Sequence, residues 1–255
     1  QPEKVTISTL RNIGVKISEG EFLAFLDADI ALSKNWLSTM LTLLDTPEFI
    51  LVSAAQTNSP DAPALERIRT TLSNAELDAE VNFLPGRNLL LRKEDFHKVG
   101  GFPEHLVTCE DYYFTDQLSH FGKLFYSSLS EYIHLGEDKV YLEMFKKEIW
   151  RGQSNLLAIK GRKIPLREVP SIVVPMIIVF SLIFSAIAIA TGHPILSLLS
   201  LFGSAGLFLI YVIRLIKLAN GEIRAWDIVK FYLYYFPARS YGTIVGLFQS
   251  LGFKK

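Results

Sequence analysis

A long apolar stretch near the end of the chain constrains the fold more than any other feature. No charged residue lies between Val169 and Ile213, and Thr191-Gly192-His193-Pro194 divides the stretch into two halves. Each half is close to the ~20 apolar residues that an α-helix needs to cross a bilayer. A buried helix pair in a soluble protein is the alternative, but two such lengths in succession argue against it. The sequence therefore predicts a transmembrane helical hairpin over residues 169–218.

Basic residues flank the predicted hairpin on both sides, whereas the turn between its halves contains no lysine or arginine. Positive charges next to membrane helices tend to stay in the cytoplasm. We therefore predict a multi-pass protein of the cell (inner) membrane whose N-terminal domain is cytoplasmic. The basic clusters are also expected to bind membrane lipids with anionic head groups. The flanking residues are Arg151, Lys160, Arg162, Lys163 and Arg167 before the hairpin, and Arg214, Lys217, Arg224 and Lys230 after it.

Two further segments are expected to contact the membrane surface. Residues 138–168 contain an amphipathic helix over Asp138–Lys160, followed by a linker. Residues 219–255 are rich in aromatic side chains between Trp226 and Phe253, which is typical both of interfacial helices and of a broken third span. For this last segment we predict an interfacial helix followed by a short segment that lies in or re-enters the membrane.

The overall composition argues against nucleic-acid binding and excludes sites that need more than one cysteine. The chain has 26 basic and 26 acidic residues among 255, so it lacks the basic surplus of a nucleic-acid-binding protein. Its single cysteine, Cys109, excludes an intrachain disulfide and a cysteine metal cluster. The length accommodates one soluble domain and a membrane hairpin. No nucleic acid is therefore expected among the partners.

The start of the chain is unusual for a domain of this kind. The chain opens on Gln1 with a strand-like segment, Lys4–Ser8, and no strand comes before it. A parallel α/β sheet that began here would lack the neighbours of its first strand. We therefore expect this sequence to be the later part of a longer protein.

A pair of aspartates follows the first apolar run of the chain. Asp27-Ala28-Asp29 comes directly after Phe22–Leu26, which is typical of a strand buried on both faces. In open α/β sheets, ligands bind at the carboxyl ends of strands. Two carboxylates so close repel each other unless a cation lies between them, and Mg²⁺ or Mn²⁺ would also bind phosphate oxygens. The pair indicates a metal–diphosphate site. The alternative is a polar turn before a helix over Lys34–Leu44, with Ser33 as its N-cap.

A second acidic pair, Glu110-Asp111, stands at the start of an amphipathic stretch, Tyr112–His120, after the turn Gly100-Gly101-Phe102. The helix macrodipole stabilises carboxylates in a first turn, which explains the pair without any function. The functional interpretation is that a carboxylate near a metal–diphosphate site takes a proton from an attacking hydroxyl group. The pair alone leaves both interpretations open.

The remainder of the first domain alternates helical and strand patterns, which is typical of an α/β fold. The pattern predicts helices over Leu10–Ser18, near Ala64–Asp78 and over Glu94–Val99, and strands over Phe49–Ala55, Leu89–Arg92 and Lys123–Ser127.

Several short motifs follow one another in the first domain. They are Arg11-Asn12-Ile13-Gly14, Gly20 to Asp29, Gly86-Arg87-Asn88, Val99-Gly100-Gly101-Phe102 and Glu110-Asp111. In this order and spacing they resemble the centre of family 2 glycosyltransferases with the GT-A fold, over roughly residues 5–155. The resemblance implies an α/β fold in which a partial GT-A (Rossmann-like) nucleotide-sugar transferase domain, residues 1–137, lacks its N-terminal part and precedes the C-terminal transmembrane helical hairpin.

The resemblance also implies a role for each matching residue. Asp27 and Asp29 would hold Mg²⁺ or Mn²⁺ on the donor diphosphate, with His134 as a third ligand. Alternatively, Asp27 contacts the donor ribose or sugar and His134 is a structural histidine. Asp111 would be the base that deprotonates the acceptor hydroxyl, and Glu110 would orient the acceptor or support Asp111. The residues implied to contact the donor are Arg11, Asn12, Asp27, Arg87, Asn88 and Arg151.

The implied activity is an inverting, metal-dependent transfer of a sugar from a nucleotide-diphosphate sugar to an acceptor at the cytoplasmic face of the membrane. A lipid-linked or glycan acceptor is expected, because the hairpin and the basic helices would hold the site at the bilayer. Processive polysaccharide synthases of the family carry Gln-x-x-Arg-Trp, whereas the comparable stretch here is Trp150-Arg151-Gly152-Gln153, which favours transfer of a single sugar. The opening strands of the family usually read the nucleobase, so we expect weak donor binding by this chain.

Two other functions fit part of the sequence. A phosphatase of the haloacid dehalogenase type also places two aspartates after a buried strand, but Gly and Thr or Val normally follow, where Ile30-Ala31 stand here. A non-catalytic membrane scaffold subunit derived from a glycosyltransferase would explain the missing opening strands. The intact Asp27, Asp29 and Asp111 argue against that alternative.

Overall fold

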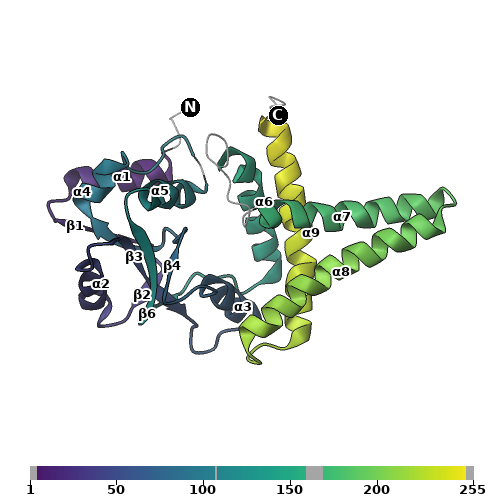
Figure 1. The fold of residues 1–255 in the computed structure, drawn as a ribbon, viewed down its shortest axis with the longest axis horizontal. Coiled ribbons are helices and arrows are strands. Elements are labelled where there is room, and N and C mark those ends of the chain that lie inside the picture. Colours follow the sequence, from purple (N-terminus) through teal and green to yellow (C-terminus); the bar gives the residue numbers. More distant parts are fainter. Residues whose placement is uncertain (1–4, 107, 159–168, 251–255) are drawn as a thin grey trace. The chain divides into compact units, whose positions relative to one another are not determined.

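The computed structural model describes residues 5–106, 108–158 and 169–250 (Figure 1). The chain divides into two compact units, which are described separately below. The sheet unit consists of residues Gln1–Asp61 and Ser73–Glu137, and the helical unit consists of Ala62–Leu72 and Asp138–Lys255.

The sheet unit contains a six-stranded mixed sheet. Its strand order is β1-β5-β3-β6-β2, with β4 also paired to β6. β3 and β6 run parallel, and the other pairs are antiparallel, so the sheet is mixed. The strands are β1 (Phe22–Leu26), β2 (Ile30–Leu32), β3 (Phe49–Thr57), β4 (Ala79–Val81), β5 (Asn88–Arg92) and β6 (Lys123–His134).

Helices cover both faces of this sheet (Figure 1). On one face, α1 (Ile7–Ile17), α4 (Lys93–Lys98) and α5 (Glu110–Ser119) contribute to one apolar core. On the other face, α2 (Trp36–Leu44) packs against side chains of alternate residues in the same strands. β5 shows this alternation directly, because Leu89 and Leu91 lie in the first core and Leu90 lies in the second.

β1 has the predicted bounds, but the expectation that both of its faces are buried was wrong. Leu23 and Phe25 are buried, whereas Ala24 and Leu26 are exposed. β1 stands at the end of the strand order with β5 as its neighbour, and the core on the α1 side covers one of its faces. Its side chains therefore alternate between core and surface, as they do in a half-covered strand.

The predicted strand at Lys4–Ser8 was also wrong over the described residues, because α1 begins at Ile7. The Thr6 side chain is its N-cap and accepts a hydrogen bond from the Thr9 backbone N–H at 3.1 Å. This cap satisfies one of the backbone N–H donors that a first helical turn leaves without an intrahelical acceptor. It stabilises a helix here, although the short apolar alternation of the segment is typical of a strand. Lys4 lies outside the described residues.

Ser33 is not the N-cap of the next helix. α2 begins at Trp36 with Asn35 as its N-cap residue, and β2 separates this helix from Asp29. The Ser33 hydroxyl instead lies 2.8 Å from both the Asn35 side-chain oxygen and the Ser130 hydroxyl of β6. The aspartate pair is therefore not part of a helix-capping turn.

Most other predicted elements are present with shifted ends. The α3 helix is shorter than predicted, at Ala64–Ser73, and the first turn of α5 contains Glu110 and Asp111, as expected. β6 extends seven residues beyond the predicted Ser127, to His134, because its second half pairs with β2 and with the end of β3. That extension brings the end of β6 next to the aspartate pair.

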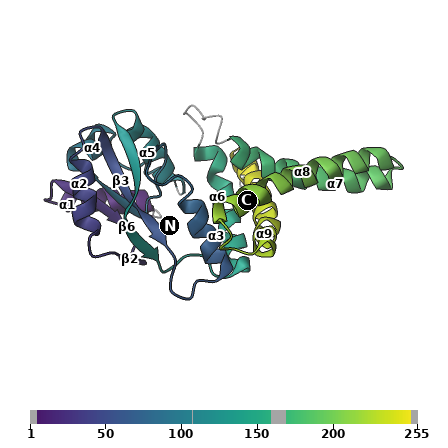
Figure 2. The same ribbon diagram turned by 60° about the horizontal axis from the view of Figure 1, so that its bottom comes forward.

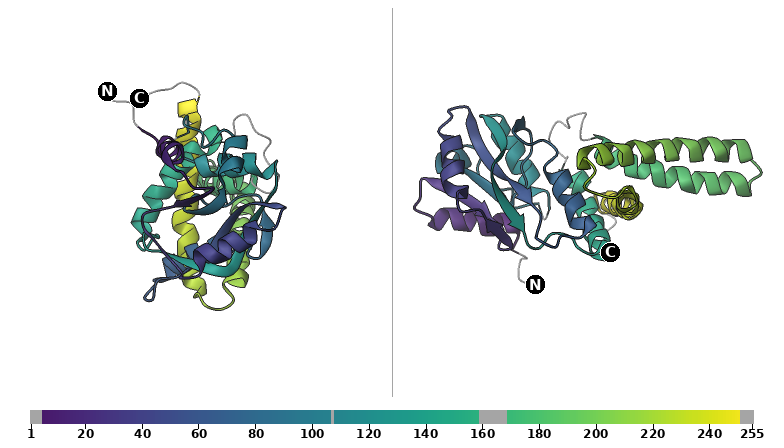
Figure 3. Two further views of the ribbon diagram at one scale, coloured as in Figure 1. Left: turned by 90° about the vertical axis from the view of Figure 1, so that its left-hand side faces the viewer. Right: turned by 90° about the horizontal axis from the view of Figure 1, so that it is seen from below.

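The helical unit contains α3, α6 (Tyr141–Ala158), α7 (Val169–Ala190), α8 (Pro194–Ala219) and α9 (Ala225–Ser250). α7 and α8 form a helical hairpin: they lie side by side near the turn that joins them and diverge away from it (Figures 1, 2 and 3). Both helices are long and apolar enough to cross a membrane. α9 is one continuous helix that includes Pro237, so the predicted division of this segment into two pieces was wrong. Its place relative to a membrane stays a prediction.

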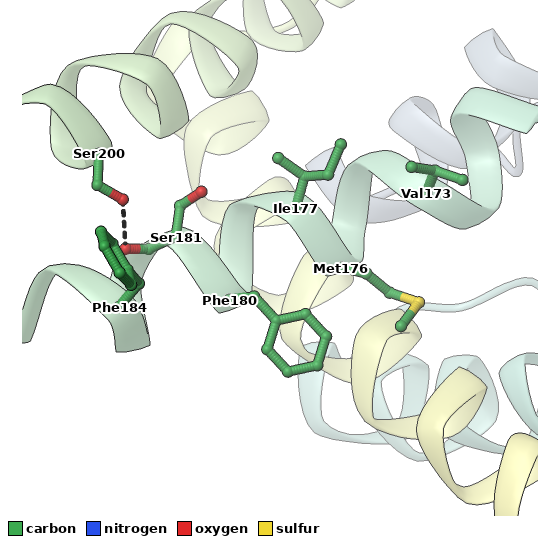
Figure 4. A pocket seen from close by; sticks show the side chains of 7 residues that line it. All are labelled: Val173, Met176, Ile177, Phe180, Ser181, Phe184 and Ser200. Atoms are coloured by element: carbon green, nitrogen blue, oxygen red, sulfur yellow. Dashed lines mark hydrogen bonds between the residues drawn. The ribbon is translucent and has the colours of Figure 1, made fainter. Parts of the chain in front are cut away.

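Serine side chains link the two helices of the hairpin. The Ser200 hydroxyl donates a hydrogen bond to the Ser181 carbonyl oxygen at 2.8 Å, beside a shallow apolar pocket (Figure 4). The hydroxyls of Ser185 and Ser197 lie 2.6 Å apart. Such interhelical hydrogen bonds are a common means of helix association where water is absent. The pocket is lined by Val173, Met176, Ile177, Phe180, Ser181, Phe184 and Ser200.

The backbones of α6 and α9 touch at glycines. A Cβ atom added to Gly152 would lie 3.0 Å from the Gly242 Cα, and one added to Gly242 would collide with the Ile149 carbonyl oxygen. A Cβ on Gly246 would collide with the Gln153 carbonyl oxygen. The two helices can approach this closely only because these positions carry no side chain.

A buried carboxylate joins three helices next to this contact. Glu148 of α6 is 2% exposed and contacts Arg69 of α3 at 3.1 Å, Arg151 at 2.6 Å and Arg239 of α9 at 3.4 Å. Burial by itself would raise the pKa of Glu148, but the three guanidinium groups outweigh it and the pKa is lowered. Glu148 is therefore ionised and acts as the shared counter-ion of the three arginines.

Replacing Glu148 by glutamine is expected to lower the free energy of unfolding by about 3–5 kcal/mol, because it leaves buried guanidinium groups without their counter-ion. The loss is expected above the ordinary carboxyl pKa of 4.5 and should shrink as the pH falls through the lowered pKa of the folded state. Denaturation followed by circular dichroism at several pH values measures it. Glu143→Gln, on the exposed side of α6, is the matched control; equal stability of the two variants would contradict the prediction.

Candidate active site

Backbone pairing places the aspartate pair at the junction of two strands. The Asp27 N–H donates to the Arg87 carbonyl oxygen at 3.1 Å, which continues the ladder between β1 and β5. The Asp29 carbonyl oxygen accepts from the Leu135 N–H at 2.8 Å, at the start of the pairing between β2 and β6. The chain between these two contacts forms a turn whose carboxylate side chains are 43% and 50% exposed.

The structure brings Asp29 and His134 together. Ile30 is the strand partner of His134, so the preceding Asp29 lies beside the histidine ring. The Asp29 Oδ2 atom is 3.3 Å from the His134 Nε2 atom. Gly136 lies against the same carboxylate, and a Cβ atom at this position would overlap Oδ2. Two of the three predicted metal ligands are therefore adjacent.

Arg11 joins the two acidic pairs. Its Nη2 atom lies 3.4 Å from the Asp27 Oδ1 atom, and its Nη1 atom lies 3.0 Å from the Glu110 Oε1 atom. The same guanidinium donates to the Gly86 carbonyl oxygen at 3.2 Å and lies over the Phe102 ring. Asp27 and Glu110, which are far apart in the sequence, thus contact the same guanidinium group, as the predicted site requires.

The pair Glu110-Asp111 occupies the first turn of α5. The Asp111 Oδ2 atom accepts a hydrogen bond from the Gly86 N–H at 3.0 Å, and its Oδ1 atom accepts from the Tyr112 N–H at 2.8 Å. Burial raises the pKa of the Glu110 carboxyl, and the charge of Asp111 adds to this, whereas Arg11 opposes it. Cys109, the N-cap residue of the helix, has a φ of 63°, a conformation that few non-glycine residues adopt.

Asn12 forms hydrogen bonds with the backbone of the turn Gly100-Gly101-Phe102. Its Nδ2 atom donates to the Phe102 carbonyl oxygen at 3.0 Å, and its Oδ1 atom accepts from the Phe102 N–H at 2.9 Å. Gly101, with a φ of 85°, lies so close to Asn12 that a Cβ atom would be 2.8 Å from Oδ1. These contacts give Asn12 a structural role, and its contact with a donor stays a prediction.

Arg87 and Asn88 point into the sheet unit. The Arg87 guanidinium donates to the Tyr132 hydroxyl at 2.7 Å and to the Gln56 Oε1 atom at 2.6 Å. Asn88 is fully buried, and its Oδ1 atom accepts from the Ala54 N–H at 3.1 Å. Both side chains brace the sheet beneath the aspartate pair, so any effect on a donor would act through their neighbours.

Arg151 belongs to the helical unit. Its guanidinium contacts Glu148 at 2.6 Å and Asp138 at 3.9 Å. The structure thus gives it a place in the ion cluster of α3, α6 and α9. Its predicted contact with the donor diphosphate stays a prediction.

The described part of the chain contains no group of three histidine, cysteine or acidic side chains arranged to hold a metal ion. Asp27 already faces Arg11, so the ligands that the protein offers are the Asp29 carboxylate and the His134 ring. A divalent ion held on a phosphate-bearing substrate often has only one or two protein ligands, with phosphate oxygens and water completing its shell. Asp29 and His134 fit that kind of site.

The sequence analysis missed three residues of this region. Gly136 makes room for the Asp29 carboxylate, Glu137 contacts the other nitrogen of the His134 ring at 3.2 Å, and Gln56 contacts Glu137 at 3.0 Å. The His-x-Gly-Glu spacing after the end of β6 was the available signal for the first two. Nothing local marked Gln56, because β3 is far away in the sequence.

A Gly136→Ala variant is expected to weaken Mn²⁺ binding by at least about tenfold, because its methyl group would displace the Asp29 carboxylate. Titration of the protein with Mn²⁺, followed by electron paramagnetic resonance (EPR), measures the affinity. Gly14→Ala is the matched control, because a Cβ atom at Gly14 meets no other atom within 4 Å. Equal affinities for the two variants would remove Asp29 from the metal site.

Comparison with known proteins identifies glycosyltransferases. A family model described as "Glycosyl transferase family 2" matches residues 1–100. The glycosyltransferase AglE of Haloferax volcanii is 25% identical over 165 residues, which cover 62% of this chain and 53% of the relative. The chain therefore spans about half the length of this curated relative.

A solved structure supports the fold. The mannosyltransferase PcManGT from Pyrobaculum calidifontis, solved in complex with GDP-Man and Mn²⁺, aligns over 97% of this chain and 67% of its own. The TM-score is 0.53 and the sequence identity is 14%, so the likeness concerns the fold. These matches confirm the predicted resemblance: residues 1–100 match a glycosyl transferase family 2 domain, and the chain has a GT-A-like mixed α/β core followed by two long apolar helices.

Proposed function

We propose that this chain forms part of an enzyme that transfers a sugar from a nucleotide-diphosphate sugar to an acceptor hydroxyl, with inversion at the anomeric carbon. The observation that carries the proposal is the contact of Arg11 with both acidic pairs, at 3.4 Å to Asp27 and 3.0 Å to Glu110. One cation thereby holds the donor end of the site next to the candidate base.

At the donor end, Asp29 and His134 would hold Mg²⁺ or Mn²⁺ on the diphosphate. The bound ion neutralises the negative charge that grows on the leaving nucleotide diphosphate. Arg11 contacts Asp27 and limits the repulsion between the two aspartates. That PcManGT was solved with GDP-Man and Mn²⁺ supports the assignment of this ligand class.

At the acceptor end, Asp111 takes the proton of the attacking hydroxyl group. Its carboxylate is fixed by the Gly86 N–H and by the N–H of the helix start, so its orientation is set before the acceptor arrives. Glu110 lies next to Asp111 in the same helical turn and is held by Arg11. A single base on one side of the sugar is the arrangement of a one-step displacement, which inverts the configuration.

The acceptor is proposed to be lipid-linked or a glycan at the cytoplasmic face of the membrane. The helices α7 and α8 have the length and apolar character of membrane spans, and basic residues follow α8 at Arg224 and Lys230. Such residues favour the cytoplasmic side and attract anionic lipid head groups. An acceptor with a membrane anchor would meet the site at that surface.

Release of nucleoside diphosphate tests the proposal. Membranes containing the full-length protein are incubated with a panel of nucleotide sugars in Mn²⁺, in Mg²⁺ and in chelator. Metal-dependent release that disappears in Asp111→Asn supports a transferase and identifies its donor. Release of phosphate from simple phosphoesters without an acceptor, or normal glycan assembly by Asp111→Asn, would favour a phosphatase or a scaffold instead.

The proposed topology makes a separate prediction. A reporter fused after Lys255 is expected to face the cytoplasm, because two spans return the chain to the side on which it started. Protease protection of the reporter in sealed vesicles measures its side, and a reporter in the turn at Gly192 serves as the outward-facing control. An outward-facing Lys255 reporter would mean that α9 also crosses the membrane.

A further inference from the structure

The histidine next to Asp29 is contacted by carboxylates at both ring nitrogens. The His134 Nε2 atom lies 3.3 Å from Asp29, and the Nδ1 atom lies 3.2 Å from the Glu137 Oε2 atom. The two carboxylates differ strongly in surroundings, because the Asp29 side chain is 50% exposed and the Glu137 side chain is 5% exposed. The ring therefore has one side open to solvent and one side facing the protein interior.

Glu137 is itself held by a buried polar chain. The Gln56 Nε2 atom donates to Glu137 at 3.0 Å, and the Gln56 Oε1 atom accepts from Arg87 at 2.6 Å. Arg87 in turn donates to the Tyr132 hydroxyl on β6 at 2.7 Å. Gln56 comes from the end of β3 and is 1% exposed. The position of the Glu137 carboxylate is thus fixed by the sheet.

The Glu137 contact determines which nitrogen of the His134 ring can bind a metal ion. A neutral ring carries one N–H, and the buried Glu137 carboxylate, which accepts it, places that hydrogen on Nδ1. In that form, which is the one that binds metals, the Nε2 lone pair points toward the Asp29 carboxylate 3.3 Å away on the open side. A carboxylate behind a histidine is the usual way in which proteins orient a metal-binding ring.

We propose that Glu137, braced by Gln56, is a positioning residue that turns His134 Nε2 toward Asp29 and so builds an oxygen–nitrogen metal site with a preference for Mn²⁺ over Mg²⁺. This inference rests on the metal role of Asp29 in the proposed function. Glu137 itself is not a ligand, because it lies at the opposite nitrogen of the ring. Mg²⁺ prefers oxygen ligands, whereas a transition-metal ion also accepts an imidazole nitrogen, so the oriented ring sets the preference.

Metal binding without donor tests the proposal independently of activity. Purified protein in detergent is titrated with Mn²⁺ and followed by EPR, and Mg²⁺ is then added as a competitor. Glu137→Gln keeps the size of the side chain but removes the carboxylate. It is expected to weaken Mn²⁺ binding by about 10–100-fold and to change Mg²⁺ binding much less. Asp95→Asn, at a buried acid of α4 that pairs with Lys98, is the matched control.

A spectroscopic signature separates positioning from a general loss of structure. Pulsed EPR of bound Mn²⁺ is expected to show coupling to an imidazole nitrogen in the unmodified protein. The coupling should be absent in His134→Ala and reduced in Glu137→Gln, with circular dichroism confirming that each variant is folded. If Glu137→Gln does not fold, Gln56→Met carries the test, with an expected loss of Mn²⁺ affinity of about tenfold.

The outcomes distinguish this inference from the proposed function. If Asp29→Ala loses Mn²⁺ binding while Glu137→Gln and His134→Ala keep the affinity, the metal preference and the spectrum of the unmodified protein, the positioning role is wrong and the metal role of Asp29 stands. If the unmodified protein binds no Mn²⁺ at millimolar concentration, His134 is a structural histidine between two carboxylates, and both proposals lose their basis.

Discussion

Replacing Asp111 by asparagine is expected to lower kcat by about 10²–10⁴-fold while the affinity for the nucleotide sugar stays within a few-fold. Asparagine keeps an oxygen for the Gly86 N–H but loses the acceptor of the Tyr112 N–H, so circular dichroism of the variant is compared with that of the unmodified protein. Its amide cannot take a proton, so the acceptor hydroxyl would have to lose its proton to water. Initial rates and donor binding are measured on the same preparation.

The matched control for this experiment is Asp116→Asn, farther along the same helix. Its side-chain oxygen faces Gln117, so it lies outside the contacts of Arg11 and Gly86. A mild loss in Asp111→Asn, similar to that of the control, would mean that the base lies elsewhere. A larger loss in Glu110→Gln than in Asp111→Asn would move the role of base to the neighbouring carboxylate, whose pKa burial already raises.

Replacing Asp29 by alanine is expected to abolish metal-dependent donor binding. Even outer partners of a metal ligand are worth 10–100-fold in affinity, so loss of a ligand should cost more than about a hundredfold. Calorimetric titration with the nucleotide sugar, in Mn²⁺ and in chelator, measures the metal-dependent part of the affinity. The Asp45→Ala variant, at an exposed position after α2, controls for the loss of one negative charge. Unchanged metal-dependent binding in Asp29→Ala would remove its metal role.

Much of the fold follows from local patterns in the sequence. The apolar run of α7 has the predicted bounds, because a membrane-length helix is specified by composition alone. The strand β1 and the helices α4 and α5 were also found near their predicted places. What local patterns missed depends on distant partners: β6 continues to His134 because β2 pairs with it, and α3 belongs to the helical unit.

The candidate site likewise combines features that the sequence predicted with features that depend on distant residues. The sequence indicated that Asp29, His134, Arg11 and the pair Glu110-Asp111 serve one site, and the structure brings Asp29 to His134 and Arg11 to Glu110. The direction of each side chain was not predictable from the motifs. Arg87 and Asn88 point inward because β5 is buried between two covered faces, so polar side chains there must find internal partners.

The membership of α3 in the helical unit has a consequence for synthesis of the protein on the ribosome. Arg69 of α3 pairs with Glu148, 79 residues later in the chain, and Glu148 also requires Arg239 of α9. At typical elongation rates, roughly ten to thirty seconds pass between the emergence of Arg69 and that of Arg239. During this interval Leu65 and Ile68, which end in the core of the helical unit, lack their partners. We therefore expect α3 of the nascent chain to depend on chaperones or on rapid membrane insertion of the following helices.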